Sequence, residues 1–436
     1  MAQTTEAACL LQSGAMYSRR LGLRRGSDDL FAGVKPGAVS IYLGDSPIYH
    51  FDLDGRWQRA FVDGTHYLKG LDASVRSLDR ERDSGAMVLR RGTLPYAMSV
   101  DLDASIRSLA LGLIDDLDNG RLEVVPGPTD VRAFAPEEFR EFLERVIGWD
   151  SAAWFAHREK YLGAYGPMPF LPPDSPNPLV LQATLGHRDG RAFGGARPAE
   201  FYERSPAEFL DHCRAVSKLV GRRVAQHKSV LLGGNDLLNR PTENVLAWLD
   251  SMAKHFPIGG PRPPVGEDWD DARTNLATVH AFLDDFAGPL PDLEGWRALR
   301  AAHLGRVTLG VESGDPVIRA GFGKFWEDGD LVRTVEDLKG VGIGVGLVVL
   351  VGVAEASGPG QHVEATTKLL ASLPLGRGDL ISLVDVRALR PLSGEVEEWP
   401  TDAGVAEEVA ALKAWSSGLA GSGPKVVAYN PIKGGF

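Results

Sequence analysis

The strongest constraint on the fold is an alternation of short apolar runs with amphipathic helical stretches along the second half of the chain. A crossover of a dozen or more residues, usually a helix, is what joins two parallel strands. We therefore expect a parallel sheet covered by helices. The predicted strands are 179–184, 229–232, 306–311, 344–351, 380–387 and 425–429, and the predicted helices are 206–219, 242–255, 268–286, 331–339, 362–373 and 402–419.

One strand of this series is difficult to place. Between the predicted helices 242–255 and 268–286, only the segment HFPIGG at 255–260 could supply a strand. Its proline and glycines are unfavourable in the middle of a sheet. The whole pattern predicts an α/β fold, a partial TIM-like (β/α)6 barrel whose working groups lie on loops at the carboxyl ends of the strands.

The first part of the chain has a different, antiparallel pattern. Residues 38–70 alternate β-branched or aromatic residues with polar ones, and glycine-containing turns interrupt them at Gly44-Asp45, Asp54-Gly55 and Asp63-Gly64. Asp-Gly between such runs is typical of a β-hairpin, because glycine adopts the positive φ of tight turns. With helical periodicity following at 105–117 and 136–147, we expect an N-terminal α+β domain that contains an antiparallel meander.

A change of pattern and a run of prolines and glycines (GAYGPMPFLPPDSPNP) divide the chain into segments. We expect an N-terminal α+β domain at 1–150, a Pro/Gly-rich linker at 151–177, the partial barrel at 178–395, and a C-terminal helix and strand covering the barrel at 396–436. A length of 436 residues fits two or three domains of roughly 100–200 residues each.

The net charge of −11 argues against nucleic acid as a partner, because a negative surface repels phosphate backbones. No run approaches the roughly 18 apolar residues of a membrane span, and the first residues do not form a basic start followed by an apolar core. We therefore expect a cytoplasmic protein without a membrane or nucleic-acid partner.

Four loops follow the predicted strands and carry polar or small residues. Gly233 and Gly234 permit a ligand to approach the backbone closely, and Asn235 or Asp236 can accept hydrogen bonds from an ammonium group. Glu312 ends a buried strand and needs a polar partner, which is either a ligand or a local cap or cation. The loops are TLGHRDGRAFGG at 184–195, LGGND at 232–236, RVTLGVESGDP at 306–316 and the strand GVGLVVLVG at 344–352.

In this order, the four loops resemble the radical S-adenosylmethionine superfamily. The resemblance covers roughly half of the chain, and its most specific part is the Gly-Val-Glu-Ser-Gly strand with the later Lys324. It implies a barrel of the radical S-adenosylmethionine type and a site for S-adenosylmethionine. The residues that it places in this site are Gly233, Gly234, Asn235, Asp236, Glu312, Ser313 and Gly314.

The first loop departs from the family at the positions that hold the iron–sulfur cluster. The family has three cysteines in a C-x3-C-x2-C spacing, whereas this chain has His187, Arg191 and Gly194, or His187, Ala192 and Gly195 in a register one residue longer. The whole chain contains two cysteines, Cys9 and Cys213. Because cluster irons need soft thiolates, we expect no [4Fe–4S] cluster. The sequence leaves open whether His187, Arg191 and Gly194 have a new role.

Three functions are compatible with this pattern. The leading hypothesis is a pseudoenzyme that keeps the fold and binds a small molecule, with a protein partner as a further expectation. The second is an enzyme that uses Glu312, Asp236 and His187 for acid–base chemistry without radicals. The third is an active radical enzyme whose cluster ligands come from another chain. We expect no other metal site, because His187, His212 and His227 lack ligand spacing.

Overall fold

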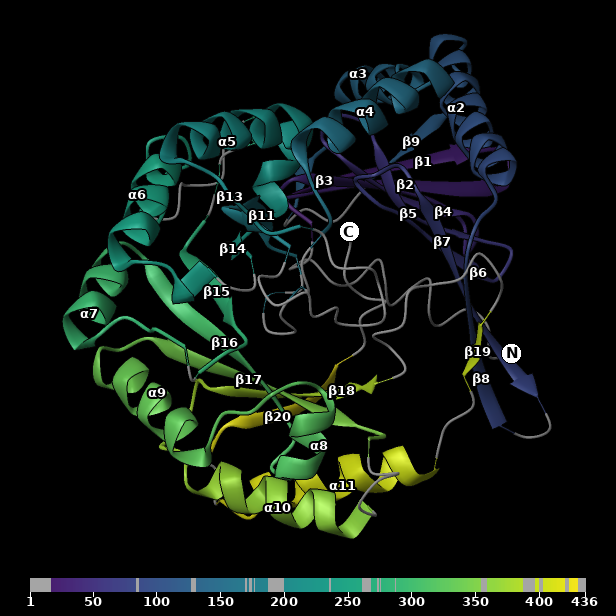
Figure 1. Ribbon diagram of the computed structural model, residues 1–436. Helices are drawn as coiled ribbons and strands as arrows, with labels where there is room; N and C mark the ends of the chain where they lie inside the picture. Colours follow the sequence, from purple (N-terminus) through teal and green to yellow (C-terminus); the bar gives the residue numbers. More distant parts are fainter. Residues whose placement is uncertain are drawn as a thin grey trace.

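The computed structural model contains two large sheets, an antiparallel one from the N-terminal part of the chain and a parallel one from the C-terminal part (Figure 1). No helix among the described residues combines the length and the apolar composition that a membrane crossing needs. The structure describes residues 17–83, 86–126, 131–168, 171, 175, 177–186, 200–234, 237–260, 268–272, 274, 276–286, 288–353, 359–386, 397–399, 403–419 and 423–429.

The parallel sheet has seven strands in the order β11-β14-β15-β16-β17-β18-β20, and every neighbouring pair is parallel. Its first six strands confirm the partial (β/α)6 barrel, and β20 adds a seventh beside β18. Figure 1 shows the sheet as an arc with helices on its outer side. The strands are β11 (Leu179–Gln182), β14 (Ser229–Gly233), β15 (Thr278–Leu283), β16 (Leu304–Glu312), β17 (Gly344–Val351), β18 (Leu380–Asp385) and β20 (Lys425–Tyr429).

The helices between these strands are long enough to return the chain to the start of the next strand. Short elements accompany them. They are the pair β12 (Thr184–Leu185) and β13 (Tyr202–Glu203), the 3-10 helices η2 (Gly221–Gln226) and η3 (Leu237–Asn239), and the helices α5 (Pro206–Val220), α6 (Thr242–Ala253), α7 (Leu293–Ala301), α8 (Pro316–Gly321), α9 (Asp328–Gly340), α10 (Pro359–Ala371) and α11 (Ala403–Ser417).

The third strand of the barrel is β15, so the predicted helix over 268–286 is wrong. The segment 255–260 contributes only an isolated bridge between Ile258 and Leu276. The segment TVHAFL of β15 lies between two strands, and all of its residues except Thr278 are buried. A central parallel strand buries both faces and therefore lacks the alternation by which a strand is recognised in a sequence.

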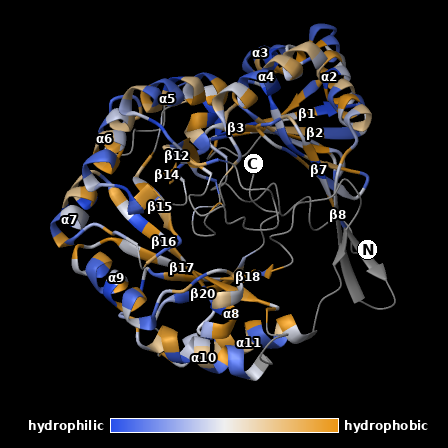
Figure 2. Ribbon diagram, viewed as in Figure 1, coloured by the Kyte–Doolittle hydropathy of each residue, from blue (hydrophilic) through white to orange (hydrophobic). Residues whose placement is uncertain are grey.

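The core of the parallel unit lies between the sheet and its helices, while a smaller apolar layer lines the inner side of the arc. Figure 2 shows the strands as mainly hydrophobic and the helices as mixed, which is typical of helices that bury one face. The inner layer consists of Phe282, Val348, Leu350 and Val384, all buried.

The antiparallel sheet confirms the predicted meander and extends it in both directions. The expected turns are present, and Gly44, Gly55 and Gly64 have φ values of 63°, 83° and 87°. The strands are β1 (Arg19–Arg25), β2 (Asp28–Lys35), β3 (Ala38–Leu43), β4 (Ile48–Asp52), β5 (Trp57–Val62), β6 (Thr65–Lys69), β7 (Val75–Asp83), β8 (Ala86–Thr93), β9 (Glu123–Val125), β10 (Arg132–Ala133) and β19 (Glu397–Trp399), the last pairing with β8.

Three helices, α2 (Tyr96–Asp118), α3 (Pro136–Ile147) and α4 (Ser151–Ala164), lie on one side of this sheet (Figure 1). Their apolar residues share a core with Phe51, Trp57 and other residues of the strands. Helix α4 occupies the first half of the segment that we expected to be a linker, and the irregular proline-rich part follows it. The four segment boundaries stay a prediction.

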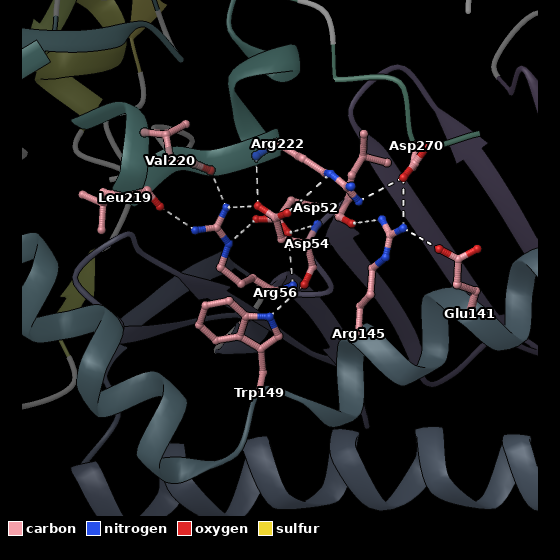
Figure 3. Close-up of polar contacts among 11 residues, drawn as sticks. Asp52, Asp54, Arg56, Glu141, Arg145, Trp149, Leu219, Val220, Arg222 and Asp270 are labelled. Atoms are coloured by element: carbon pink, nitrogen blue, oxygen red, sulfur yellow. Dashed lines mark hydrogen bonds and ion pairs between the residues drawn. The ribbon is translucent and has the colours of Figure 1, made fainter. Parts of the chain in front are cut away.

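A polar network joins the two sheets (Figure 3). The guanidinium group of Arg56, in the antiparallel unit, donates to the carbonyl oxygens of Leu219, at 2.7 Å, and of Val220, at the end of α5. It also pairs with Asp52 at 2.7 Å, and the backbone N–H of Arg222 donates to Asp54 at 2.9 Å. Arg56 therefore caps α5 with a positive charge, which the partial negative charge of a helix C-terminus favours.

Candidate functional site

A group of three charged side chains, two of them buried, lies at the carboxyl ends of β15 and β16. Asp284 follows β15 directly, Glu312 is the last residue of β16, and Lys324 follows α8. The Lys324 Nζ atom lies 2.9 Å from Glu312 Oε2, contacts Asp284 Oδ1, and donates a hydrogen bond of 2.9 Å to the Gly310 carbonyl oxygen. An ammonium group has three donors, and two of them are used by Asp284 and the Gly310 carbonyl oxygen, while the contact with Glu312 is an ion pair.

The backbone of β16 is shaped to bring this group together. Its pairing with β17 shifts between Gly310 and Glu312, and Glu312 has a φ of 58°, which is uncommon for a residue with a side chain. A Cβ atom on Gly310 would lie 2.4 Å from Asp284 Oδ1 and 2.7 Å from Lys324 Nζ. Only glycine therefore leaves room for the three side chains to meet.

The electrostatics of the site are set by complete burial. Desolvation raises the pKa of Glu312 to about 7, against the lowering effect of Lys324, and Asp284 raises it further. Burial alone would lower the pKa of Lys324, but the two carboxylates outweigh burial and raise it. Glu312 thus titrates near neutral pH beside a cation that stays charged.

Several oxygen atoms near this edge of the sheet lack a donor. No described residue gives a well-directed hydrogen bond to either carboxylate oxygen of Glu312, although Lys324 is within ion-pair distance of one. Asn239 Oδ1 and Thr184 Oγ1, which follow the ends of neighbouring strands, are also buried and have no hydrogen-bond partner among the described residues. Asn239 is held by hydrogen bonds of 3.2 and 3.3 Å from its Nδ2 atom to the carbonyl oxygens of Asp285 and Pro289. Among the described residues, the carboxyl edge of the parallel sheet therefore has several buried oxygen atoms that could each accept a hydrogen bond.

The predicted residues of the second loop lie at this same edge. Gly233 ends β14, and Gly234, with a φ of 131°, packs so closely that a Cβ atom would lie 1.8 Å from Thr184 Oγ1. Asn235 and Asp236 lie outside the described residues, as do the first-loop positions His187, Arg191 and Gly194.

Ser313 and Gly314 contact helix α10. The Ser313 hydroxyl is 2.9 Å from His362 Nδ1 and accepts a hydrogen bond from the Asp315 N–H, so the hydroxyl donates to the imidazole. The other ring nitrogen of His362 donates to the Leu350 carbonyl oxygen at 3.1 Å. Gly314 donates to Thr366 Oγ1 at 2.9 Å. These contacts hold α10 against β16, and ligand binding by Ser313 and Gly314 stays a prediction.

Asp284 is a member of the site that the sequence did not suggest. The sequence pattern predicts a helix over this segment, and therefore no strand end at Asp284. The signal was present in the sequence, because two acidic residues, Asp284 and Asp285, directly follow the apolar segment TVHAFL.

Cys213 and His212 occupy structural positions in helix α5. Cys213 is fully buried in α5, and burial raises its pKa to about 12. His212 accepts a hydrogen bond from the Gln182 N–H at 2.9 Å, and its Nδ1 atom lies 3.0 Å from the Ala164 carbonyl oxygen. Within the described residues, no group of three or more histidine, cysteine or acidic side chains could hold a metal ion.

Neither a family model nor a curated protein matches this sequence. Solved structures match it with probability 1.00. A radical S-adenosylmethionine methyltransferase from Kitasatospora setae is 16% identical, with a TM-score of 0.32, and the match covers 47% of this chain and 36% of that one. Coproporphyrinogen III oxidase from Escherichia coli, a radical S-adenosylmethionine enzyme, is 9% identical, with a TM-score of 0.35, covering 62% and 57%.

A third match is the FeFe-hydrogenase maturase from Carboxydothermus hydrogenoformans, which is 13% identical, with a TM-score of 0.34, covering 76% of this chain and 73% of that one. The first two belong to the family that the four loops resemble. At these identities and scores, the likeness transfers no activity, substrate or cofactor to this chain.

Proposed function

We propose that this chain is a member of the radical S-adenosylmethionine superfamily that lacks the cluster and binds a small polar ligand at the carboxyl edge of its parallel sheet. The observation that carries the proposal is the fully buried Glu312, whose carboxylate oxygens receive no well-directed hydrogen bond from the described residues. Ligands of α/β barrels bind at this edge.

S-adenosylmethionine fits the chemistry of the unsatisfied atoms. Glu312, Asn239 and Thr184 offer oxygen acceptors, and the ligand carries an ammonium group and ribose hydroxyls as donors. A donor from the ligand would supply the hydrogen bond that the buried carboxylate lacks. When bound, S-adenosylmethionine would bring a sulfonium centre, whereas this chain supplies the acceptors and the buried counter-cation.

The residues do not fit a [4Fe–4S] cluster. Three thiolates are needed, and the chain has only Cys9 and Cys213, the latter fully buried with a pKa raised to about 12. Without a cluster inside the chain, there is no electron donor for reductive cleavage of S-adenosylmethionine. A cluster with ligands from another chain is the remaining route to radical chemistry.

A second candidate is an enzyme that performs acid–base chemistry at the same edge. The observation that favours it is the pKa of Glu312, raised by burial to about 7, because a general acid or base works best when its pKa is near the working pH. Asp236 and His187, which we proposed as its partners, lie outside the described residues.

Calorimetric titration with S-adenosylmethionine and S-adenosylhomocysteine tests the ligand. Glu312→Gln should weaken binding roughly ten-fold or more, because a hydrogen bond to a charged group contributes about 1.5–3 kcal/mol. A matched control is Asp379→Asn, since Asp379 is also buried and pairs with a lysine, Lys339, but lies at the opposite, amino-terminal edge of the sheet.

The control should bind like the unmutated protein. If neither ligand binds the unmutated protein at millimolar concentration, the ligand half of the proposal is wrong. A product assay on the bound ligand then separates the two candidates, because only the enzyme converts it.

A further inference from the structure

The side of the antiparallel sheet that faces away from α2, α3 and α4 carries a second group of polar and aromatic side chains. Side chains alternate between the two faces of a strand, and the register places Ser40, His50 and Arg59 next to one another on β3, β4 and β5. The neighbouring row on this face contains Tyr42 and Phe61, on either side of Ile48. Figure 1 shows the three helices on the other side of these strands.

Two cations on this face have no counterion among the described residues. Lys35, on β2, and Arg59, on β5, have no acidic side chain of the described part of the chain within ion-pair distance, in contrast to the paired Arg24 and Arg56 of the same unit. Lys35 lies 4.7 Å from the centre of the Tyr17 ring, and its pKa is lowered by burial and by the charge of Arg59. Unpaired positive charge in a chain of net charge −11 marks a local site for an anion.

His50 lies between these cations and is held in a fixed orientation. Its Nδ1 atom is 2.8 Å from the Ser40 hydroxyl oxygen, and the Tyr42 ring packs edge-on at 6.0 Å. The Nε2 atom, on the far side of the ring, has no hydrogen-bond partner among the described residues. Burial, Lys35 and Arg59 lower the pKa of His50 to about 4, so the ring is neutral at pH 7.

We propose that this face binds a small aromatic anion, with its phosphate or carboxylate group held by Lys35, Arg59 and His50 and its ring against Tyr42, Ile48 and Phe61. The anion supplies the charge that the two cations lack. The neutral imidazole can donate its Nε2–H when Nδ1 accepts from Ser40. Tyr42, Ile48 and Phe61 are partly exposed and offer an apolar surface to a ring.

Titrations with phenyl phosphate, benzoate and inorganic phosphate test the site in the full chain. We expect saturable binding of phenyl phosphate or benzoate that is tighter than that of inorganic phosphate, and the tighter of the two identifies the anionic group. Arg59→Ala and Lys35→Ala should each weaken binding ten-fold or more, which corresponds to about 1.4 kcal/mol. Arg59 is exposed, so its replacement should leave the melting temperature unchanged.

The control variant is Lys413→Ala, which removes an exposed cation of α11 and should bind like the unmutated chain. A second readout is the nuclear magnetic resonance titration of the His50 ring, whose pKa should rise from about 4 in the presence of the ligand. The proposal is overturned if no aromatic anion saturates, if Lys413→Ala weakens binding as much as Arg59→Ala, or if inorganic phosphate binds as tightly as phenyl phosphate.

Discussion

Lys324 determines the charge balance of the candidate site. It is almost completely buried, and its ammonium group is shared between Glu312, Asp284 and the Gly310 carbonyl oxygen. Burying any one of these charges without its counter-charge would cost free energy of folding, so the two carboxylates and the ammonium group stabilise one another. Burial raises the pKa of Glu312, and Lys324 counteracts this rise.

Replacing Lys324 by methionine should therefore destabilise the protein by about 3–5 kcal/mol, because it leaves a buried carboxylate without its cation. The loss should be largest at alkaline pH. Burial raises the folded-state pKa of Glu312 to about 7, above its unfolded value, so Glu312 already disfavours folding as the pH rises through this range. Without Lys324, this pKa rises further. Urea unfolding at pH 6 and pH 8 measures both effects.

Lys339→Met is the matched control for this prediction. Lys339 also pairs with a buried carboxylate, that of Asp379, at 2.5 Å, but its own side chain is 31% exposed. A partly exposed pair contributes less than a buried one. Equal losses of stability in the two variants, at both pH values, would show that the Lys324 contacts are no stronger than an ordinary partly exposed pair.

Glu312 could be predicted from the sequence, but its partners could not. A carboxylate at the end of a buried strand is a local signal, and it left two roles open, a ligand contact or a structural ion pair. In the structure the partner is the cation Lys324. It follows α8, and its ammonium group lies against the end of β16, the strand that precedes α8. Contacts of this kind depend on the tertiary path of the chain, which residue spacing does not encode.

At the scale of elements, local turn chemistry was the most reliable signal. Asp54-Gly55 and Asp63-Gly64 predicted hairpins because glycine adopts the required positive φ without steric cost, and both turns are present. The strand β15 was missed because a strand buried on both faces has the composition of a buried helix segment. The prediction therefore failed for an element whose identity is decided by its neighbours in the sheet.

The contact between the hairpin at Asp54-Gly55 and the end of α5 gives an element-scale prediction (Figure 3). Arg56→Met should cost about 3–5 kcal/mol, because it removes two hydrogen bonds to the last carbonyl groups of α5 and one of the two cations, Arg56 and Arg223, that act on the fully buried carboxylate of Asp52. Because these contacts join the two sheets, the calorimetric transition should also broaden or divide into two.

Arg222→Met serves as the control in the same network. Arg222 pairs with Asp270 at 3.0 Å, but its side chain is 41% exposed. Exposed pairs contribute about 0–1 kcal/mol, so this variant should melt as one unit near the temperature of the unmutated protein. A single, unbroadened transition in Arg56→Met would contradict the role of Arg56 in coupling the sheets.

Across the described residues, histidines with a lowered pKa are distributed over both units of the protein. Burial lowers the pKa of His50, His212 and His227 to about 4 and that of His157 to about 3, and it also lowers the pKa of His362. Hydrogen bonds such as the one that His212 Nε2 accepts from the Gln182 N–H require the neutral ring, because a protonated ring nitrogen cannot accept. Both units of the protein therefore depend on unprotonated imidazoles.

The last prediction is an early loss of stability in acid. Each of these histidines has a folded-state pKa below its unfolded value near 6.5, so the unfolded chain takes up protons first as the pH falls from 6.5 towards 4. The stability that they contribute is present above pH 6.5 and is lost below it. Each one contributes a slope of up to about 1.4 kcal/mol per pH unit, so five together approach roughly 7 kcal/mol per pH unit. Glu312 has the opposite effect on the free energy of unfolding, because its folded-state pKa is raised. As a single group it offsets the slope of only one histidine.

A domain is stable by only about 5–15 kcal/mol, so the protein should unfold between pH 6 and pH 4. Urea midpoints at pH 8, 6.5, 5.5 and 5 measure the slope. His212→Asn should reduce this pH slope by up to about 1.4 kcal/mol per pH unit, because one buried imidazole is then absent from the folded state. This reduction is expected whatever the effect of the substitution on stability at pH 8. Replacing the exposed His66 by asparagine is the control. A protein that is equally stable at pH 8 and pH 5 would show that these imidazoles accept protons within the folded state.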